Sequence, residues 1–216
     1  MSQPTDDRPP ARVLLLRHAE TTAPDRFHGC ESDVGLSVRG TCQADEVAPD
    51  IRGRKPAAIY CSGLRRAVET ARRIARDVLP EPIVIEALHE RRMGPLSNTP
   101  RAATWPIYEE TRRRWMAGEL DATHEGGESF AAIRDRIVPV FRELAQRHRG
   151  ETIAVVAHGV VIRVALCSLV EGLGPRHFAE LPIDYVRIYE LLGDGQRWRL
   201  DTQAAPAAGA RDPSPW

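Results

Sequence analysis

The sequence predicts one α/β domain with three layers, in which helices cover both faces of a central, mostly parallel sheet. Three observations favour this fold class. Short apolar runs without helical spacing recur along the chain and indicate strands buried on both faces. Amphipathic segments with a 3.6-residue period lie between these runs and indicate helices. The last apolar segments alternate with polar residues, which is typical of an antiparallel hairpin at a sheet edge.

The first apolar run, Val13–Leu16, is predicted to be a buried strand, and it ends abruptly at Arg17 and His18. These two residues are therefore expected at the carboxyl end of the strand, which is the edge where open α/β sheets bind ligands. A histidine held there could attack phosphorus while the neighbouring guanidinium holds the anionic oxygens. For these residues alone, a solvated pair at a strand end is the simpler interpretation.

Two helices are expected on either side of the second strand, Ala57–Cys61. The first begins after Ser37, a plausible N-cap, and is expected to end near Pro49. The second is expected to begin at Ser62 as its N-cap. Its apolar residues follow the 3.6-residue period as far as Leu79, and arginine and acidic side chains fill the opposite face, so it is strongly amphipathic.

The later segments continue this alternation of strands and helices. The predicted elements are a strand at 83–85, a helix at 102–117 kinked or begun by Pro106, a helix at 130–144 bent by Pro139, a strand at 152–157, a helix at 160–169, and a hairpin from Tyr185 that turns at Gly193–Gly195. The turn is expected to contain the two glycines because it separates two alternating segments. In that pattern, Val186 and Ile188 belong to one face of the first hairpin strand.

The length of 216 residues suits a single domain, which we expect over residues 12–201. The polar, proline-rich residues 1–11 and the alanine-, proline- and glycine-rich residues 202–216 are expected to be disordered. The first of these segments lacks the apolar stretch of a signal peptide or membrane anchor. No run approaches the roughly 20 apolar residues of a spanning helix.

The composition favours a small-metabolite protein in the cytoplasm. Thirty basic and thirty acidic residues cancel, so no global field would attract nucleic acid or an anionic membrane. Lys55 is the only lysine and lies outside a G-x-x-x-x-G-K motif, which excludes a P-loop enzyme. The four cysteines lack C-x-x-C spacing, which argues against a zinc site and a disulfide scaffold. Neither metal nor cofactor is expected, and the oligomeric state is left open.

Three further polar clusters follow apolar runs, at Ser62–Ala71, Leu88–Gly94 and Val155–Gly159. Together with Arg17-His18-Ala19-Glu20, and in this order, they resemble the histidine phosphatase superfamily, which includes cofactor-dependent phosphoglycerate mutases and many small phosphatases. The resemblance covers roughly residues 12–201 and implies the phosphoglycerate mutase-like fold.

The resemblance also implies a role for each cluster. His18 would be the nucleophile that becomes phosphohistidine, and Arg17 and Arg66 would bind the phosphate. His158 would lie across the phosphate and stabilise charge in the transition state. Glu90 would donate a proton to the leaving alkoxide. Helix geometry supports one of these assignments, because Arg66 is expected in a first helical turn, where the helix dipole favours an anion.

The sequence also departs from the family pattern. The family commonly has R-H-G-E followed by an asparagine, whereas position 19 is alanine and residues 21–24 contain no asparagine. A segment similar to the family's R-F-x-G follows after a shorter loop. Further residues that could bind substrate are Arg26, His28, Gly29 and Gly159. Gly126–Ser129 matches another family segment, which we expect to form a loop and a helix cap.

These observations predict a metal-independent phosphomonoesterase that acts on a small phosphorylated metabolite. A cysteine phosphatase is excluded because the C-x5-R motif would need an arginine at Ala67, and neither a D-x-D nor an H-E-x-x-H motif occurs. A phosphoglycerate mutase-type isomerase is the first alternative. Mutases of this family typically have a lysine in the segment corresponding to 96–100, which has none here. A non-catalytic phospho-ligand binder is less favoured, because His18, Arg66, Glu90 and His158 are all present.

Overall fold

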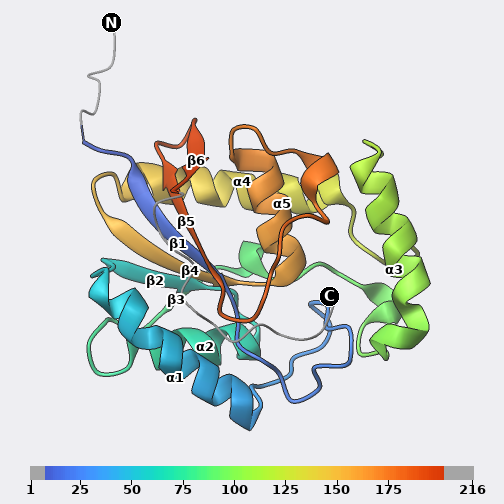
Figure 1. Cartoon of the computed structure of the whole chain (residues 1–216), viewed down its shortest axis with the longest axis horizontal. Helices are drawn as coiled ribbons and strands as arrows, with labels where there is room; N and C mark the ends of the chain where they lie inside the picture. The colour runs from blue at the N-terminus through green and yellow to red at the C-terminus, as the bar shows by residue number, and fades with distance from the viewer. Residues whose placement is uncertain (1–7, 202–216) are drawn as a thin grey trace, which may run out of the picture.

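The computed structural model describes residues 8–201, which form a six-stranded sheet between two layers of helices (Figure 1). The strand order is β3-β2-β4-β1-β5-β6. The first four strands along the chain run parallel, and the last two join antiparallel at one edge. The strands are β1 (Ala11–Arg17), β2 (Ala58–Cys61), β3 (Ile83–Val84), β4 (Thr152–Ala157), β5 (Ile188–Gly193) and β6 (Trp198–Leu200). The predicted fold class and the antiparallel edge hairpin are confirmed.

Five helices complete the architecture of the described residues. One face of the sheet is covered by α1 (Val38–Gly53) and α2 (Arg65–Ala75), and the other by α4 (Phe130–Arg147) and α5 (Gly159–Leu169). The helix α3 (Arg101–Met116) stands at the side of the molecule (Figure 1). The sheet is therefore buried on both faces, as the continuous apolar runs predict.

The alternation of side chains along β1 divides the core in two. Leu14 and Leu16 pack in the cluster that contains α1 and α2, whereas Val13 and Leu15 pack in the cluster that contains α4 and α5. All four side chains are fully buried. This burial stabilises β1 as a rigid central strand and fixes the position of its last residue.

The pairing of β1 with β4 determines where the site forms. Arg17 is paired with Ala157 in a parallel register, and the backbone N–H of His18 donates to the Ala157 carbonyl at 3.0 Å. His158 follows Ala157 directly. The two central strands therefore deliver both histidines to the same carboxyl edge of the sheet.

The beginning and end of α2 differ from the prediction. The helix begins at Arg65 after Leu64, and Ser62 is fully buried at the end of β2, so the prediction of Ser62 as the N-cap was wrong. Asp33, from a distant loop, instead accepts a hydrogen bond from the Arg65 N–H at 2.6 Å. The helix ends at Ala75 rather than near Leu79.

The prediction for α1 was correct at its start and wrong at its end. The Ser37 hydroxyl caps the helix by accepting a hydrogen bond from the Gly40 N–H at 2.9 Å. Pro49 lies inside the helix, which continues to Gly53. The helix continues past the proline because buried Ile51 packs with the sheet beneath it, and this packing outweighs one missing backbone donor.

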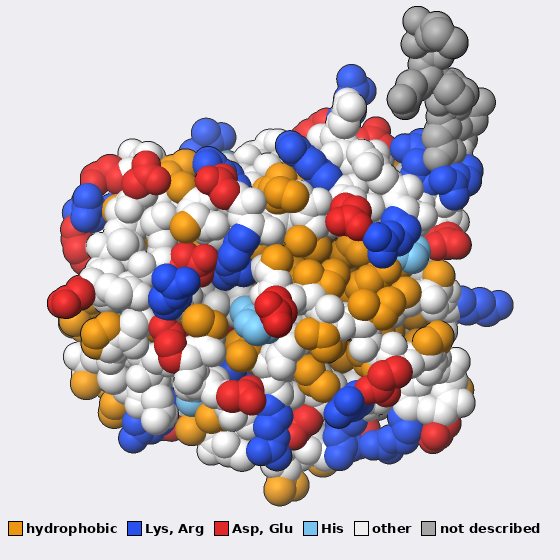
Figure 2. Space-filling view, turned by 180° about the vertical axis from the view of Figure 1, so that it is seen from behind, with side chains coloured by type: hydrophobic (Ala, Val, Ile, Leu, Met, Phe, Trp, Pro, Cys, Tyr) orange, Lys and Arg blue, Asp and Glu red, His pale blue; other side chains and the backbone are white. Residues whose placement is uncertain are grey.

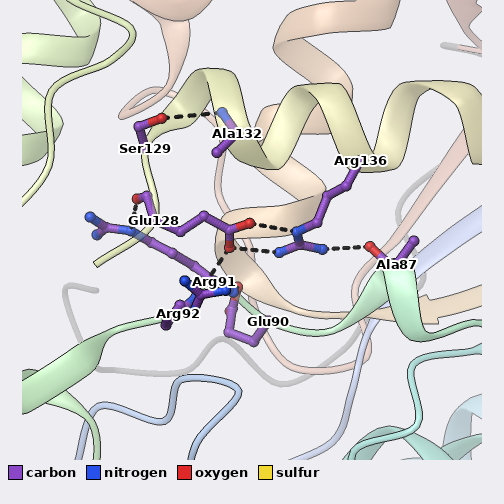
Figure 3. Close-up of polar contacts among 8 residues, drawn as sticks. All are labelled: Ala87, Glu90, Arg91, Arg92, Glu128, Ser129, Ala132 and Arg136. Atoms are coloured by element: carbon purple, nitrogen blue, oxygen red, sulfur yellow. Dashed lines mark hydrogen bonds and ion pairs between the residues drawn. The ribbon is translucent and has the colours of Figure 1, made fainter. Parts of the chain in front are cut away.

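The other helices lie close to their predicted ranges. Pro106 and Pro139 lie inside α3 and α4, neither of which ends there. The Ser129 hydroxyl accepts a hydrogen bond from the Ala132 N–H at 3.1 Å and caps α4 (Figure 3). The expected helix cap in the Gly126–Ser129 segment is therefore confirmed.

The edge hairpin begins later than predicted. Val186 has a left-handed φ of 52°, and β5 starts only at Ile188, so the prediction that both belong to one strand was wrong. The turn between the hairpin strands is stabilised by Asp194, whose carboxylate accepts hydrogen bonds from the N–H groups of Gln196 and Arg197 at 2.8 Å.

At the amino-terminal boundary, Ala11 is a fully buried residue of β1 rather than part of a disordered segment. Residues 1–7 and 202–216 lie outside the described residues, so the prediction that they are disordered stays a prediction. In the described chain, no helix is both long and apolar enough to cross a membrane. The face opposite to the view of Figure 1 carries interspersed acidic and basic side chains around an apolar area (Figure 2).

Candidate active site

Two buried histidines form the centre of the site. The ring centroids of His18 and His158 lie 5.1 Å apart, and the two residues are 6% and 0% exposed. His18 follows β1, and His158 precedes the first turn of α5. The proximity predicted from two strand ends is thus present in the structure.

The hydrogen bonds of His18 define its tautomer. Its Nδ1 lies 2.7 Å from the Ala19 carbonyl oxygen, which can only accept, so Nδ1 carries the proton. Burial, followed by the positive charges of Arg66 and Arg17, holds the pKa of His18 well below its usual value of 6.5. The imidazole is therefore neutral, and Nε2 keeps a lone pair that can act as a nucleophile.

His158 has the opposite tautomer. The Arg66 Nε–H group donates to its Nδ1 at 3.3 Å, so the proton of the neutral ring resides on Nε2. Burial, Arg66 and His18 hold the pKa of His158 well below 6.5. Among the described residues, this buried Nε2 has no hydrogen-bond partner. It can therefore donate a hydrogen bond to an oxygen atom held next to His18.

Arg66 lies in the first turn of α2, as expected, and is fully buried. Its guanidinium donates to the carbonyl oxygens of Ser32 at 2.8 Å and Gly29 at 3.2 Å, in addition to His158. Burial lowers the pKa of Arg66 to about 10. The guanidinium thus anchors the loop after β1 and orients His158, and it does not line the cavity itself.

Arg17 lies against the segment that precedes β5. Its Nη1 donates to the Ile183 carbonyl at 2.7 Å, and its guanidinium carbon lies 4.1 Å from the ring centroid of Tyr185. The buried Nε has no hydrogen-bond partner among the described residues. Arg17 therefore combines a fixed orientation with an N–H group available to an anion.

Glu90 is a buried carboxyl group without an ion-pair partner in the described chain, rather than a surface salt bridge. Its two oxygens accept hydrogen bonds from the backbone N–H of Arg91 at 2.7 Å and of Val160 at 3.3 Å. Val160 belongs to the first turn of α5, which follows His158. The helix start thus holds the carboxyl group beside the histidines.

The neighbouring arginine points away from Glu90 (Figure 3). The Arg91 Nε–H donates to the Glu128 carbonyl at 2.7 Å, and the guanidinium carbon lies 4.6 Å from the ring centroid of Trp115. The Glu128 carboxylate pairs with Arg136 at 2.7 Å. These contacts fix the loop that carries Glu90 while leaving its carboxyl group free of a cationic partner.

A cavity of about 80 Å³ lies at this edge of the sheet. The predicted site residues that line it are Arg17, His18, His28, Glu90 and Gly159. His28 is constrained by its own loop, because its Nε2 donates to the Ala23 carbonyl at 2.7 Å and its Nδ1 accepts from the Ser32 hydroxyl at 2.7 Å. Burial lowers the pKa of His28.

Two predicted substrate-binding residues lie outside the cavity lining. The Arg26 guanidinium bonds to the Asn98 carbonyl. A Cβ atom at Gly29 would lie 2.9 Å from Met93, so the glycine permits close packing of two loops. Both residues therefore shape the wall of the site from outside.

Sequence reasoning missed several residues of the cavity wall, including Thr21, Phe27, Arg101, Tyr108, Arg163 and Tyr185. Arg163 had a detectable signal, because it is the only charged residue in the otherwise apolar predicted helix 160–169. Phe27 also had one, as the phenylalanine of the segment similar to R-F-x-G. The others have no local signal, since they come from segments that meet only in the folded chain. Within residues 8–201, no group of three or more His, Cys, Asp or Glu side chains could hold a metal ion.

Fold and site together define the class of protein. The chain belongs to the histidine phosphatase superfamily (branch 1), whose family model matches residues 13–205, and the predicted resemblance is confirmed. It is 30% identical over 200 residues to a metal-independent phosphoserine phosphatase of Arabidopsis thaliana, covering 88% of this chain and 79% of the relative. It is also 30% identical over 239 residues to a 2,3-bisphosphoglycerate-dependent phosphoglycerate mutase of Corynebacterium glutamicum, covering 92% and 95% of the two chains.

A solved structure agrees with these relatives. The mycobacterial glucosyl-3-phosphoglycerate phosphatase in complex with VO3 has a TM-score of 0.77 and 27% sequence identity, and the match covers 88% of this chain and 96% of that chain. The family therefore contains both phosphatases and mutases that are similar to this protein over most of its length.

Proposed function

We propose that this protein is a phosphomonoesterase that hydrolyses a small phosphorylated metabolite through a phosphohistidine on His18. One observation carries the proposal: the only ring nitrogen of His18 free to act as a nucleophile lies beside a cavity lined by Glu90 and Arg17. The small cavity volume of about 80 Å³ supports a substrate well below drug size.

In the first half-reaction, the Nε2 lone pair of His18 attacks phosphorus, and the bond from phosphorus to the alcohol oxygen breaks. Glu90 gives its proton to that oxygen, so the alcohol leaves in neutral form. Arg17 and the Nε2–H of His158 stabilise the charge on the phosphoryl oxygens. The neutral state of both histidines supports these two different roles.

In the second half-reaction, water attacks the phosphohistidine. The Glu90 carboxylate accepts a proton from this water, the bond from phosphorus to Nε2 breaks, and inorganic phosphate leaves. The cycle returns His18 and Glu90 to their starting states. It needs no metal, and the similarity to the metal-independent phosphoserine phosphatase of Arabidopsis thaliana supports this part of the proposal.

A mutase is the second candidate, and the similarity to the Corynebacterium mutase supports it. A mutase must exclude water until phosphate returns to the bound intermediate, whereas a phosphatase admits water. The absence of a lysine from residues 96–100 favours hydrolysis. The phosphoserine phosphatase and glucosyl-3-phosphoglycerate phosphatase relatives also favour it. The presence of both histidines and Glu90 makes a purely binding function the least favoured of the three.

Rapid quench with a ³²P-labelled phosphomonoester tests the chemistry. The wild-type protein should form an acid-labile, base-stable phosphoenzyme, and His18→Ala should abolish it. His177→Gln, which replaces a histidine outside the cavity lining, is the matched control and should leave labelling intact. Label on Cys61 or on a carboxylate would contradict the proposal.

An enolase-coupled assay separates the two candidates. Phosphate release should exceed the conversion of 3-phosphoglycerate to 2-phosphoglycerate, even when 2,3-bisphosphoglycerate is supplied. Mutase turnover well above the rate of hydrolysis for every ester tested would establish the alternative.

A further inference from the structure

Three contacts with the segment just before β5 fix the position of Arg17. The Arg17 Nη1 donates to the Ile183 carbonyl at 2.7 Å, and the guanidinium carbon lies 4.1 Å from the ring centroid of Tyr185. The backbone N–H of Val186 donates to the Arg17 carbonyl at 3.1 Å. Residues 183–186 thus hold one arginine of the candidate active site by both its side chain and its backbone.

These contacts leave one N–H group of Arg17 next to the cavity. The buried Nε has no hydrogen-bond partner among the described residues. A Cβ atom at Gly159 would lie 3.9 Å from this Nε, and Gly159 lines the cavity at the start of α5, directly after His158. The unpartnered N–H group therefore lies near the helix start, within reach of an anion held beside the two histidines.

The Tyr185 ring packs against two groups of the proposed chemistry. It lies under the Arg17 guanidinium, and its ring centroid is 5.9 Å from that of His18. A guanidinium is attracted to the face of an aromatic ring, most strongly where both are removed from water. Tyr185 is only 9% exposed and lines the cavity. The ring therefore restrains the guanidinium on the side opposite to a bound anion's charge.

A strained turn carries this ring. The Arg187 N–H donates to the Asp184 carbonyl at 3.2 Å, and Val186, the third residue of the turn, has a φ of 52°. Turns with positive φ at this place favour glycine or asparagine, and for a β-branched residue the conformation is an outlier. Such outliers persist where the surrounding structure holds them, and they cluster at functional sites. Here the Val186 side chain packs against the core cluster that contains α1 and α2, while Tyr185 lies against Arg17.

We propose that Tyr185 is a positioning residue of the active site, whose ring holds Arg17 so that its Nε–H group can bind the phosphate, and that the turn at Val186 holds this ring in place. This rests on the proposed function, because it assigns the phosphate to the place beside His18. Tyr185 acts through Arg17, so its effect on phosphate binding should disappear when Arg17 is replaced.

Calorimetric binding of inorganic phosphate tests the role of the ring. Tyr185→Leu should weaken binding by about 10-fold, which corresponds to about 1.4 kcal/mol and lies within the range of a desolvated cation–π contact. Tyr185→Phe, which keeps the ring, should restore binding to within about 2-fold of the wild type. Tyr60→Leu is the matched control, because it removes a buried tyrosine of β2 that lies outside the cavity lining, and it should leave binding unchanged.

A double-mutant cycle shows whether the ring acts through Arg17. In the Arg17→Gln background, Tyr185→Leu should have little further effect on phosphate binding, and additive losses would refute the proposal. Val186→Asn tests the turn, because asparagine tolerates the left-handed conformation. This variant should retain phosphate binding, and a loss as large as that of Tyr185→Leu would overturn the assignment of the turn.

An NMR measurement without ligand separates this inference from the proposed function. The ¹⁵N heteronuclear NOE of the Arg17 Nε–H group, assigned with Arg17→Gln, should be high in the wild type and in Tyr185→Phe, and low in Tyr185→Leu. If phosphohistidine forms on His18 but this NOE is unchanged in Tyr185→Leu, the inference is refuted and the phosphatase stands. If the NOE depends on Tyr185 but the wild type neither binds phosphate nor forms phosphohistidine, the positioning contact stands and the proposed function fails.

Discussion

Glu90→Gln is the substitution that best tests how the site protonates its leaving group. Glutamine keeps the shape of the side chain, but its amide cannot protonate an alkoxide. Both carboxyl oxygens accept backbone hydrogen bonds, from Arg91 at 2.7 Å and from Val160 at 3.3 Å. The amide can satisfy only one of these donors with its oxygen, and its NH₂ group then faces the other.

Two magnitudes follow from this geometry. Loss of a positioned general acid should lower kcat/KM by about 10²-fold or more for esters of poorly leaving alcohols. The loss for p-nitrophenyl phosphate should be much smaller, because its leaving group needs little protonation. One backbone N–H of the buried pair becomes unsatisfied, so the free energy of unfolding should fall by about 1–3 kcal/mol.

The assay is kcat/KM across a series of aryl and alkyl phosphates, with urea unfolding measured on the same proteins. Glu128→Gln is the matched control. The Glu128 backbone carbonyl accepts a hydrogen bond from Arg91, the residue next to Glu90, but the Glu128 carboxylate pairs with Arg136 instead of facing the cavity (Figure 3). It should change stability without changing the dependence on the leaving group. Equal losses of Glu90→Gln on all esters would refute the assignment and leave Glu90 a structural residue.

The remaining predictions concern pH, packing and metals. Because burial holds the pKa values of His18 and His158 below 6.5 in the folded protein, the unfolded chain takes up protons first as the pH falls. The free energy of unfolding, measured by urea titration, should therefore fall as the pH is lowered from about 7 to about 5, and it should recover when the pH is raised again. The substitution Arg91→Met should lower the free energy of unfolding by about 2–4 kcal/mol, because the buried Arg91 guanidinium donates to the Glu128 carbonyl and stacks on Trp115. Activity should survive EDTA, which a phosphate-release assay checks.

Each of these has an outcome that contradicts it. A pH-independent unfolding free energy, or one whose slope is unchanged in His158→Gln, would show that the buried histidines are not the groups involved. Arg92→Met, at an exposed neighbour, is the control for Arg91→Met, and equal losses in both would exclude the buried contacts as the cause. Activity lost in EDTA and restored by added metal would contradict the metal-independent mechanism.

The sequence alone predicted the frame of the site. Apolar runs in β1 and β4 stop at Arg17-His18 and at His158, and parallel strands end at a common edge. These two facts are enough to bring the histidines together. A strand that is buried on both faces can be recognised from its continuous apolar run, so both strand ends could be predicted from the sequence. The same local rules found the caps at Ser37 and Ser129, whose side chains bond to N–H groups in the next turn.

Local rules failed where a distant residue supplied the decisive contact. The helix α2 begins at Arg65 because Asp33 accepts from its N–H, and no pattern near Ser62 reveals this partner. The hydrogen bonds of Arg66 to loop carbonyls and to His158 also come from distant segments, and its role in binding phosphate stays a prediction.

The tertiary structure also decided the chemistry of individual atoms. The sequence named His18, His158 and Glu90, but the tautomers follow from the Ala19 carbonyl and from Arg66. The position of the Glu90 carboxyl group depends on the hydrogen bond that it accepts from the Val160 N–H in the first turn of α5. Local sequence determines which segments bury themselves in the sheet. Hydrogen bonds, desolvation and the shape of a cavity depend on groups that approach one another only when the chain folds, and for this reason the specificity of the site could not be read from its motifs.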